Sequence, residues 1–199
     1  MTRFVATSSE ESLRAESVRS GMTLLVTVPP WKDLVCLDIL VEADDVGPHH
    51  EPLVFSSQWM DVPLNALHLN QIGLLDGLHV TWPQNSANHP LQPPASVYNG
   101  MHGMVTRMDL WLTHVEGAQY DLAVTGAAEF TRAFEIETRI TLDKIVASND
   151  ENTQDADVAA WFETRFAATG FVPAWQVQLI INRELHSYVA KHPNISEQI

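Results

Sequence analysis

Residues 33–106 contain no lysine and no arginine. A stretch of this length with average composition would carry roughly eight basic residues. The same stretch has eight carboxylates, which are Asp33, Asp38, Glu42, Asp44, Asp45, Glu51, Asp61 and Asp76. Its negative charge is therefore not compensated locally. Such a field favours basic partners or metal ions and excludes nucleic acid as a partner.

Cysteine is almost absent as well. The single Cys36 excludes an internal disulfide and is typical of a protein from a reducing compartment. The first residues contain no apolar segment of the kind found in secretory signals, and no run approaches the roughly 18 apolar residues that span a bilayer. We therefore expect a cytoplasmic protein that does not contact a membrane.

Catalytic and phosphate-binding motifs are also missing. The sequence has no G-x-S-x-G, no G-x-x-x-x-G-K-[ST], no G-x-G-x-x-G and no H-E-x-x-H. Cys36 stands between two apolar residues and close to two aspartates, which is the opposite of the electropositive setting that activates a thiol. The sequence thus names no reaction, and we assign no catalytic residue.

Apolar residues, in contrast, are plentiful. They make up 45% of the 199 residues, with six Trp and seven Phe, so the chain has the material for a core despite its net charge of −14. Residues 1–21 are polar and predict an N-terminal arm or a short helix. Residues 22–199 show no linker and predict a single domain.

The clearest strand signals lie in the second half of the chain. Apolar and polar residues alternate over residues 104–115, 118–125 and 133–146, and short turn segments separate these stretches. The pattern predicts three consecutive antiparallel strands, a meander.

The C-terminal residues favour helices. Val158, Trp161, Phe162 and Phe166 have helical spacing and end before Gly170. A second stripe follows Pro173 and stops before Pro193, and its members are Val177, Ile180, Ile181, Leu185, Tyr188 and Val189. The sequence therefore predicts an α+β fold, in which two C-terminal amphipathic helices pack on one side of an antiparallel sheet.

A possible metal site lies in the turn that contains His49, His50 and Glu51, because imidazole and carboxylate groups suit zinc and related ions. Adjacent histidines in extended backbone point to opposite sides, so a solvated acidic turn is the alternative. Four further histidines would join the site only if the fold brought them to it, and they are His68, His79, His89 and His102.

Several aromatic residues near the acidic stretch are candidates for contact with a partner. Trp and Tyr are enriched at protein interfaces, and carboxylates beside them suit arginine-rich partners. The predicted partner-binding residues are Asp44, Asp45, Glu51, Trp31, Trp59, Trp82 and Tyr98. Residues 83–103, which contain four prolines, are expected to form a long loop that lacks regular structure over most of its length.

These features predict a non-enzymatic acidic protein that neutralises or inhibits a basic protein partner. Immunity proteins that block a toxin's active site belong to this functional class, although nothing in the sequence identifies that family. Two alternatives remain at this point: a hydrolase that depends on a metal or on histidine and uses the His/carboxylate-rich region, and a subunit of a larger assembly.

Overall fold

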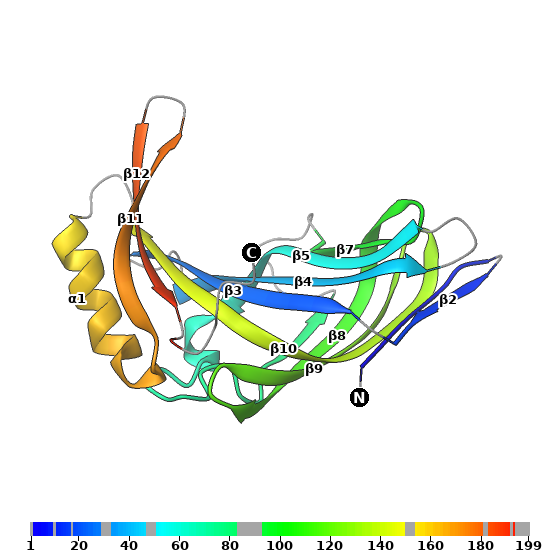
Figure 1. Cartoon of the computed structure of the whole chain (residues 1–199), viewed down its shortest axis with the longest axis horizontal. Coiled ribbons are helices and arrows are strands. Elements are labelled where there is room, and N and C mark those ends of the chain that lie inside the picture. Colours follow the sequence, from blue (N-terminus) through cyan, green and yellow to red (C-terminus); the bar gives the residue numbers. More distant parts are fainter. Residues whose placement is uncertain are drawn as a thin grey trace.

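The chain folds mainly into one 12-stranded sheet, which curves strongly from end to end (Figure 1). The computed structural model describes residues 2–9, 11–16, 18–28, 33–46, 51–82, 93–149, 154–180, 183–191 and 193. The strands are β1 (Arg3–Thr7), β2 (Ser12–Ala15), β3 (Arg19–Val28), β4 (Leu34–Val46), β5 (Glu51–Pro63), β6 (His79–Trp82), β7 (Ala95–Tyr98), β8 (His102–Glu116), β9 (Gln119–Ala128), β10 (Thr131–Asn149), β11 (Val172–Ile180) and β12 (Arg183–Lys191). One α-helix, α1 (Asp155–Phe166), and two short 3₁₀ helices, η2 (Leu64–Ala66) and η3 (Ala167–Thr169), complete the described elements.

Strand pairing forms a closed circuit. It runs from β3 through β4, β5, β7, β8, β9 and β10 and returns to β3. The 19-residue strand β10 makes this closure possible, because its first part pairs with β9 and its last part pairs with β3. Every pairing in the circuit is antiparallel except the one between β10 and β3. The circuit therefore has an inward and an outward set of side chains.

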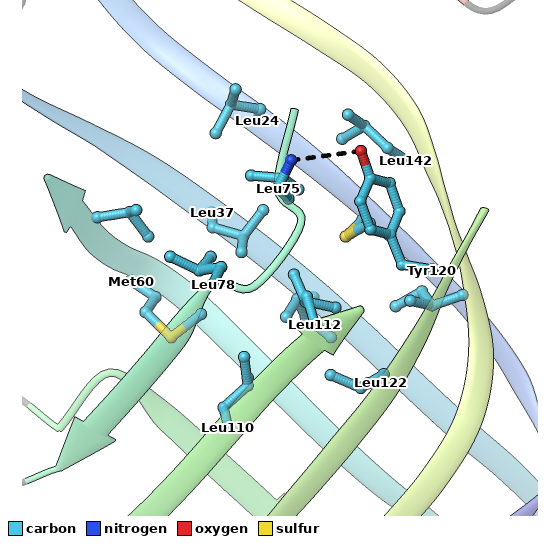
Figure 2. Close-up of a cluster of buried hydrophobic side chains, with 14 of the residues drawn as sticks. Leu24, Leu37, Met60, Leu75, Leu78, Leu110, Leu112, Tyr120, Leu122 and Leu142 are labelled. Carbon is cyan, nitrogen blue, oxygen red and sulfur yellow. Dashed lines mark hydrogen bonds between the residues drawn. The ribbon is translucent and has the colours of Figure 1, made fainter. Parts of the chain in front are cut away.

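The inward side chains fill the circuit with a hydrophobic core (Figure 2). The segment between β5 and β6 adds four buried leucines to this core, Leu67, Leu74, Leu75 and Leu78. The hydroxyl oxygen of Tyr120, on β9, accepts a hydrogen bond from the backbone N–H of Leu75 at 3.4 Å, so a polar contact fixes that segment inside the core (Figure 2). Because the inside is packed with side chains, the outward side chains are the ones available for binding.

Helix α1 and the segment between β5 and β6 are held together by Asn70. Its backbone N–H donates to the carbonyl of Arg165 at 2.7 Å, and its side-chain amide donates to the carbonyl of Thr164 at 3.1 Å. Its amide oxygen accepts from the N–H of Ala168 at 3.2 Å. Asn70 has φ of 65°, a left-handed conformation that asparagine tolerates better than most residues. Two carbonyl groups in the last turn of α1 thereby have hydrogen-bond partners.

The structure confirms the meander. Strands β8, β9 and β10 are consecutive antiparallel neighbours, at the positions that the alternation predicts. It also confirms the first C-terminal helix as α1, which buries Val158, Phe162 and Phe166.

The prediction of a second C-terminal helix is wrong. The predicted α+β fold, which depends on two C-terminal helices packed on one side of the sheet, is therefore wrong as well. Residues 172–191 form the antiparallel hairpin of β11 and β12. Three successive residues of β12, Tyr188, Val189 and Ala190, are buried. A strand covered on both faces loses strict alternation, and its apolar run then resembles a helical stripe. Of the side chains expected in the docked helices, Ile181 and Leu185 lie outside the described part.

One further sequence expectation needs correction. The N-terminal residues form the hairpin of β1 and β2, which pairs with β10, and are neither a loose arm nor a helix. Within the expected loop at residues 83–103, the described part contains the short strand β7, which pairs with both β5 and β8, and the first residues of β8. Residues 83–92 lie outside the described part of the chain.

Gly126 marks a close approach between β8, β9 and β10. A Cβ atom built on it would collide with the carbonyl oxygen of Arg107 and lie 2.6 Å from Cζ of Phe134. We expect Gly126→Ala to lower the free energy of unfolding by about 1–3 kcal/mol, because a backbone atom and a buried ring must both move. Urea unfolding gives the value. Gly21→Ala is the matched control, since its added methyl meets only the end of the Asp143 side chain, which can turn away. An equal loss in the two variants would contradict this reasoning.

Candidate functional site

The outward side chains of β3, β4, β5, β7 and β8 form a continuous surface, which we call the outer face. Residues paired directly across neighbouring strands point to the same side of a sheet, so the register defines rows of side chains on this face. One row consists of Arg19, Glu42, Val54, Tyr98 and His102. The next row consists of Gly21, Leu40, Ser56, Ser96 and Met104.

The second row is apolar at two exposed positions and small between them. Leu40 is 46% exposed and Met104 is 41% exposed, whereas two serines lie between them. The first row ends in a contact between the rings of Tyr98 and His102, whose centroids are 4.8 Å apart. The outer face thus combines accessible apolar side chains with a shallow serine-lined middle, a composition that accommodates the side chains of a partner.

A bulge in β10 places Asp143 at the edge of this face. Leu142 pairs with Met22 and Lys144 pairs with Thr23, so Asp143 is the extra residue between them. Its carboxylate occupies the space beside Gly21, where any Cβ atom would collide with it. Burial raises the pKa of the Asp143 carboxyl above its ordinary value, and the neighbouring Lys144 partly offsets this rise. The bulge therefore directs a partly buried acid toward β3.

A second irregularity lies between β4 and β5. Leu37 pairs with Met60 and Ile39 pairs with Ser57, so β5 has one residue more than β4 across this interval. The buried hydroxyl of Ser57 repairs the interrupted ladder: it accepts from the N–H of Ile39 at 2.7 Å and donates to the carbonyl of Leu37 at 3.1 Å. Asp38 stands on the outer face between these paired residues, opposite Thr23.

These irregularities border an open groove of about 710 Å³ across β10, β3, β4 and β5. We call it the carboxylate groove. Its acidic lining consists of Asp38, Glu42 and Asp143. Arg19 also lines it and lies 3.4 Å from a carboxylate oxygen of Glu42, in a pair that is exposed and so contributes little to stability. With three carboxylates and one arginine, the groove is suited to a positively charged group.

Cys36 lies on the same strand as Asp38. Its thiol donates to a carboxylate oxygen of Asp61 at 3.5 Å. Burial, followed by the negative charges of Asp61 and Asp38, raises the pKa of Cys36 from 9.0 to about 12. The thiol therefore stays protonated at neutral pH, which fits the expectation that it is not a nucleophile.

The predicted partner-binding residues fall in different places. Tyr98 lies on the outer face, whereas Trp82 is partly buried against the core. Asp44 and Asp45 belong to the end of β4, and Glu51 begins β5, so the backbone brings all three to one end of this hairpin. The side chains of these three residues and of Trp59 lie outside the described part, as does the whole of Trp31.

The described residues contain no metal site of the kind that the sequence suggested. His49 and His50 lie outside the described residues, and within the described ones no three His, Cys, Asp or Glu side chains gather in a way that could hold a metal ion. Two of the other histidines are engaged with aromatic rings, His79 with Trp111 and His102 with Tyr98. His68 is exposed, and His89 lies outside the described part.

Sequence reasoning did not single out Asp143, Leu40 or Met104. A signal for the first is present: Asp143 and Lys144 are two successive polar residues between the buried Leu142 and Ile145, which is how a bulge interrupts alternation. The exposure of Leu40 and Met104 has no local signal, because both stand in apolar, strand-forming segments.

Comparison with protein-family models, with curated proteins and with solved structures gave no match. Within the described part of the chain, the helices are all too short or too polar to cross a membrane.

Proposed function

We propose that this chain is a non-enzymatic binding protein whose outer face binds a basic protein and thereby neutralises or inhibits it. The observation that carries the proposal is the carboxylate groove, in which Asp38, Glu42 and Asp143 line one surface depression. The absence of lysine and arginine from residues 33–106 extends the same negative field over β4, β5 and β7. Opposite charge speeds association and selects partners. The proposal includes the cytoplasmic location that the single cysteine favours.

Asp143 favours the binding of a cation in the groove. Its carboxyl is partly buried beside Gly21, and this burial disfavours the charged form. A lysine or arginine side chain from the partner would compensate that charge and so lower the pKa of the Asp143 carboxyl again. Leu40, Tyr98 and Met104 would supply the apolar contacts beside it.

Association kinetics test this proposal. The protein is used as bait to capture partners from its source cell, and the association rate of a captured partner is measured by stopped flow at several salt concentrations. The test variant carries Asp38→Asn, Glu42→Gln and Asp143→Asn. We expect it to associate at least about tenfold more slowly at low salt and to show a weaker salt dependence. A second variant reverses the charges of Asp44, Asp45 and Glu51 and extends the test to the end of the β4–β5 hairpin.

The matched control removes three carboxylates outside the outer face through Glu11→Gln, Glu16→Gln and Glu116→Gln. It has the same net charge as the first test variant, so a mere effect of total charge would slow both equally. Equal rates in the two variants, or a captured partner that is acidic, would refute the proposal. Recovery of further copies of this chain alone would favour an assembly subunit instead.

A further inference from the structure

A second surface, on β6, β8, β9, β10 and β1, has a different character. The register places His79, Trp111, Ala123, Glu137 and Arg3 in one row across these five strands. The adjoining row is Thr81, Asp109, Thr125, Glu135 and Val5. An open groove of about 500 Å³, which we call the β9 groove, runs beside these rows and is lined by Arg107, Asp109, Thr125 and Glu135, among others.

Trp111 does not line this groove itself but lies in the row of side chains next to its lining residues Asp109 and Thr125. The ring of His79 stacks on the indole, with centroids 4.6 Å apart and an interplanar angle of 11°. On its other side, the cross-strand neighbour of Trp111 is Ala123, whose methyl group is too small to cover an indole face. Trp111 is accordingly 40% exposed, although it lies in the middle of a strand. An exposed indole next to a small residue can stack against a flat apolar surface of a ligand.

The charged side chains around the groove are already balanced. Arg3 pairs with Glu135 and lies 3.6 Å from a carboxylate oxygen of Glu137. Beyond the row of Trp111, and outside the groove lining, Arg139 donates to Asp121 through Nη2 at 2.9 Å and through Nε at 3.0 Å. These pairs hold donors and acceptors side by side in fixed positions, in contrast to the excess of carboxylates in the carboxylate groove.

The wall formed by β8 has the same mixture. A carboxylate oxygen of Asp109 lies 3.6 Å from Nε2 of His79, and Arg107 lines the groove next to it. An anionic ligand would meet the carboxylates of Asp109 and Glu135, and a cationic ligand would have to compete with the arginines for them. A neutral ligand rich in hydroxyl groups meets neither obstacle, because each hydroxyl both donates to a carboxylate and accepts from an arginine.

We infer that the β9 groove binds a neutral carbohydrate. A pyranose ring has an apolar face of C–H groups that stacks on the indole of Trp111, and equatorial hydroxyls that reach Asp109, Glu135 and Arg107 in the groove. The volume of the groove lies within the range of small-molecule sites. This site and the carboxylate groove share only strand β10, where they use different residues, Glu135 and Asp143 respectively, and the site does not depend on the function proposed for the outer face.

Fluorine NMR tests the inference. The protein is labelled with 5-fluorotryptophan, and the resonance of Trp111 is assigned as the one missing from Trp111→Phe. Maltohexaose, cellohexaose, xylohexaose and hexa-N-acetylchitohexaose are titrated separately up to about 10 mM, enough to detect a Kd in the millimolar range. We expect at least one of them to shift the Trp111 resonance in a saturable manner. A heparin hexasaccharide and N-acetylarginine amide serve as the anionic and cationic probes.

Ala123→Leu fills the floor beside Trp111 and should weaken the shift at least about tenfold. Ser56→Leu is its matched control, because it adds the same side chain to the outer face and should leave the shift intact. If circular dichroism shows that Ala123→Leu is unfolded, Asp109→Asn replaces it, with an expected weakening of about tenfold or more from the loss of a charge-assisted hydrogen bond. The inference is overturned if no neutral probe gives a saturable shift, if a charged probe shifts the resonance more strongly, or if the groove variant binds like its control.

Discussion

Phe162→Ala should lower the free energy of unfolding by about 3–5 kcal/mol, the cost of emptying a buried aromatic position. Phe162 is 1% exposed and joins α1 to the sheet. Its ring stacks on Phe166 with centroids 4.8 Å apart and meets the ring of Tyr188, on β12, edge to face at 5.3 Å. The truncation therefore removes a ring contact between α1 and the hairpin of β11 and β12.

Phe130→Ala is the matched control for this change, because Phe130 is 48% exposed between β9 and β10. The same atoms are deleted, but little area is returned to water, so we expect a loss within about 0.5 kcal/mol. Urea unfolding monitored by circular dichroism provides both values. Similar losses in the two variants would mean that α1 does not depend on Phe162 for its attachment to the sheet.

This helix also shows where sequence reasoning succeeds. The period of 3.6 in residues 158–166 is a local property and leads directly to α1. The same holds for strands β8, β9 and β10, whose alternation and short turns are visible in consecutive residues. Elements that are specified by their own sequence were predicted correctly.

Elements that depend on distant contacts were not. The closure of the circuit requires Val146 of β10 to pair with Leu25 of β3, more than one hundred residues away in the sequence. Parallel strands are not joined by a tight turn, so no turn residues in the sequence indicate this pairing. The hairpin of β11 and β12 was mistaken for a helix because α1 buries β12 on a second face, a fact that local periodicity does not contain.

The candidate site also has features that the sequence predicts and features that depend on contacts between distant residues. Its negative charge was visible as the missing lysine and arginine in residues 33–106, and Tyr98 was among the residues predicted from that stretch. The carboxylate groove was not visible, because it needs Asp143 of β10 beside Gly21 of β3. The rows of the outer face depend on cross-strand register, which composition cannot supply.

Tyr120→Phe should destabilise the protein at neutral pH and do so less at alkaline pH. Tyr120 is fully buried, and its hydroxyl oxygen is the acceptor for the N–H of Leu75 (Figure 2). Without the hydroxyl this buried N–H has lost its partner, which costs about 1–3 kcal/mol. The wild-type protein should therefore be the more stable of the two at pH 8.

The advantage of the wild-type protein should shrink as the pH rises. Burial raises the pKa of Tyr120 from 10.0 to about 12; the hydrogen bond from Leu75 opposes this rise, and the charge of Asp76 adds to it. Between pH 10 and about pH 12, the tyrosine of the unfolded chain releases its proton, whereas the buried tyrosine of the folded chain still holds it. The folded state therefore loses stability as the pH rises through this range. By pH 11.5 the loss amounts to about 2 kcal/mol, at 1.36 kcal/mol for each pKa unit. Phenylalanine does not titrate and escapes it.

Urea unfolding of both proteins at pH 8 and pH 11.5 measures the change in this difference. Cys36, whose pKa is also raised to about 12, titrates in the same range, but it is present in both proteins and cancels in the comparison. The decrease of about 2 kcal/mol in the stability difference between the wild-type protein and Tyr120→Phe is thus specific to Tyr120. If the stability difference between the two proteins stayed constant from pH 8 to pH 11.5, the hydroxyl of Tyr120 would not be buried inside the circuit. The segment that carries Leu75 would then not cover it.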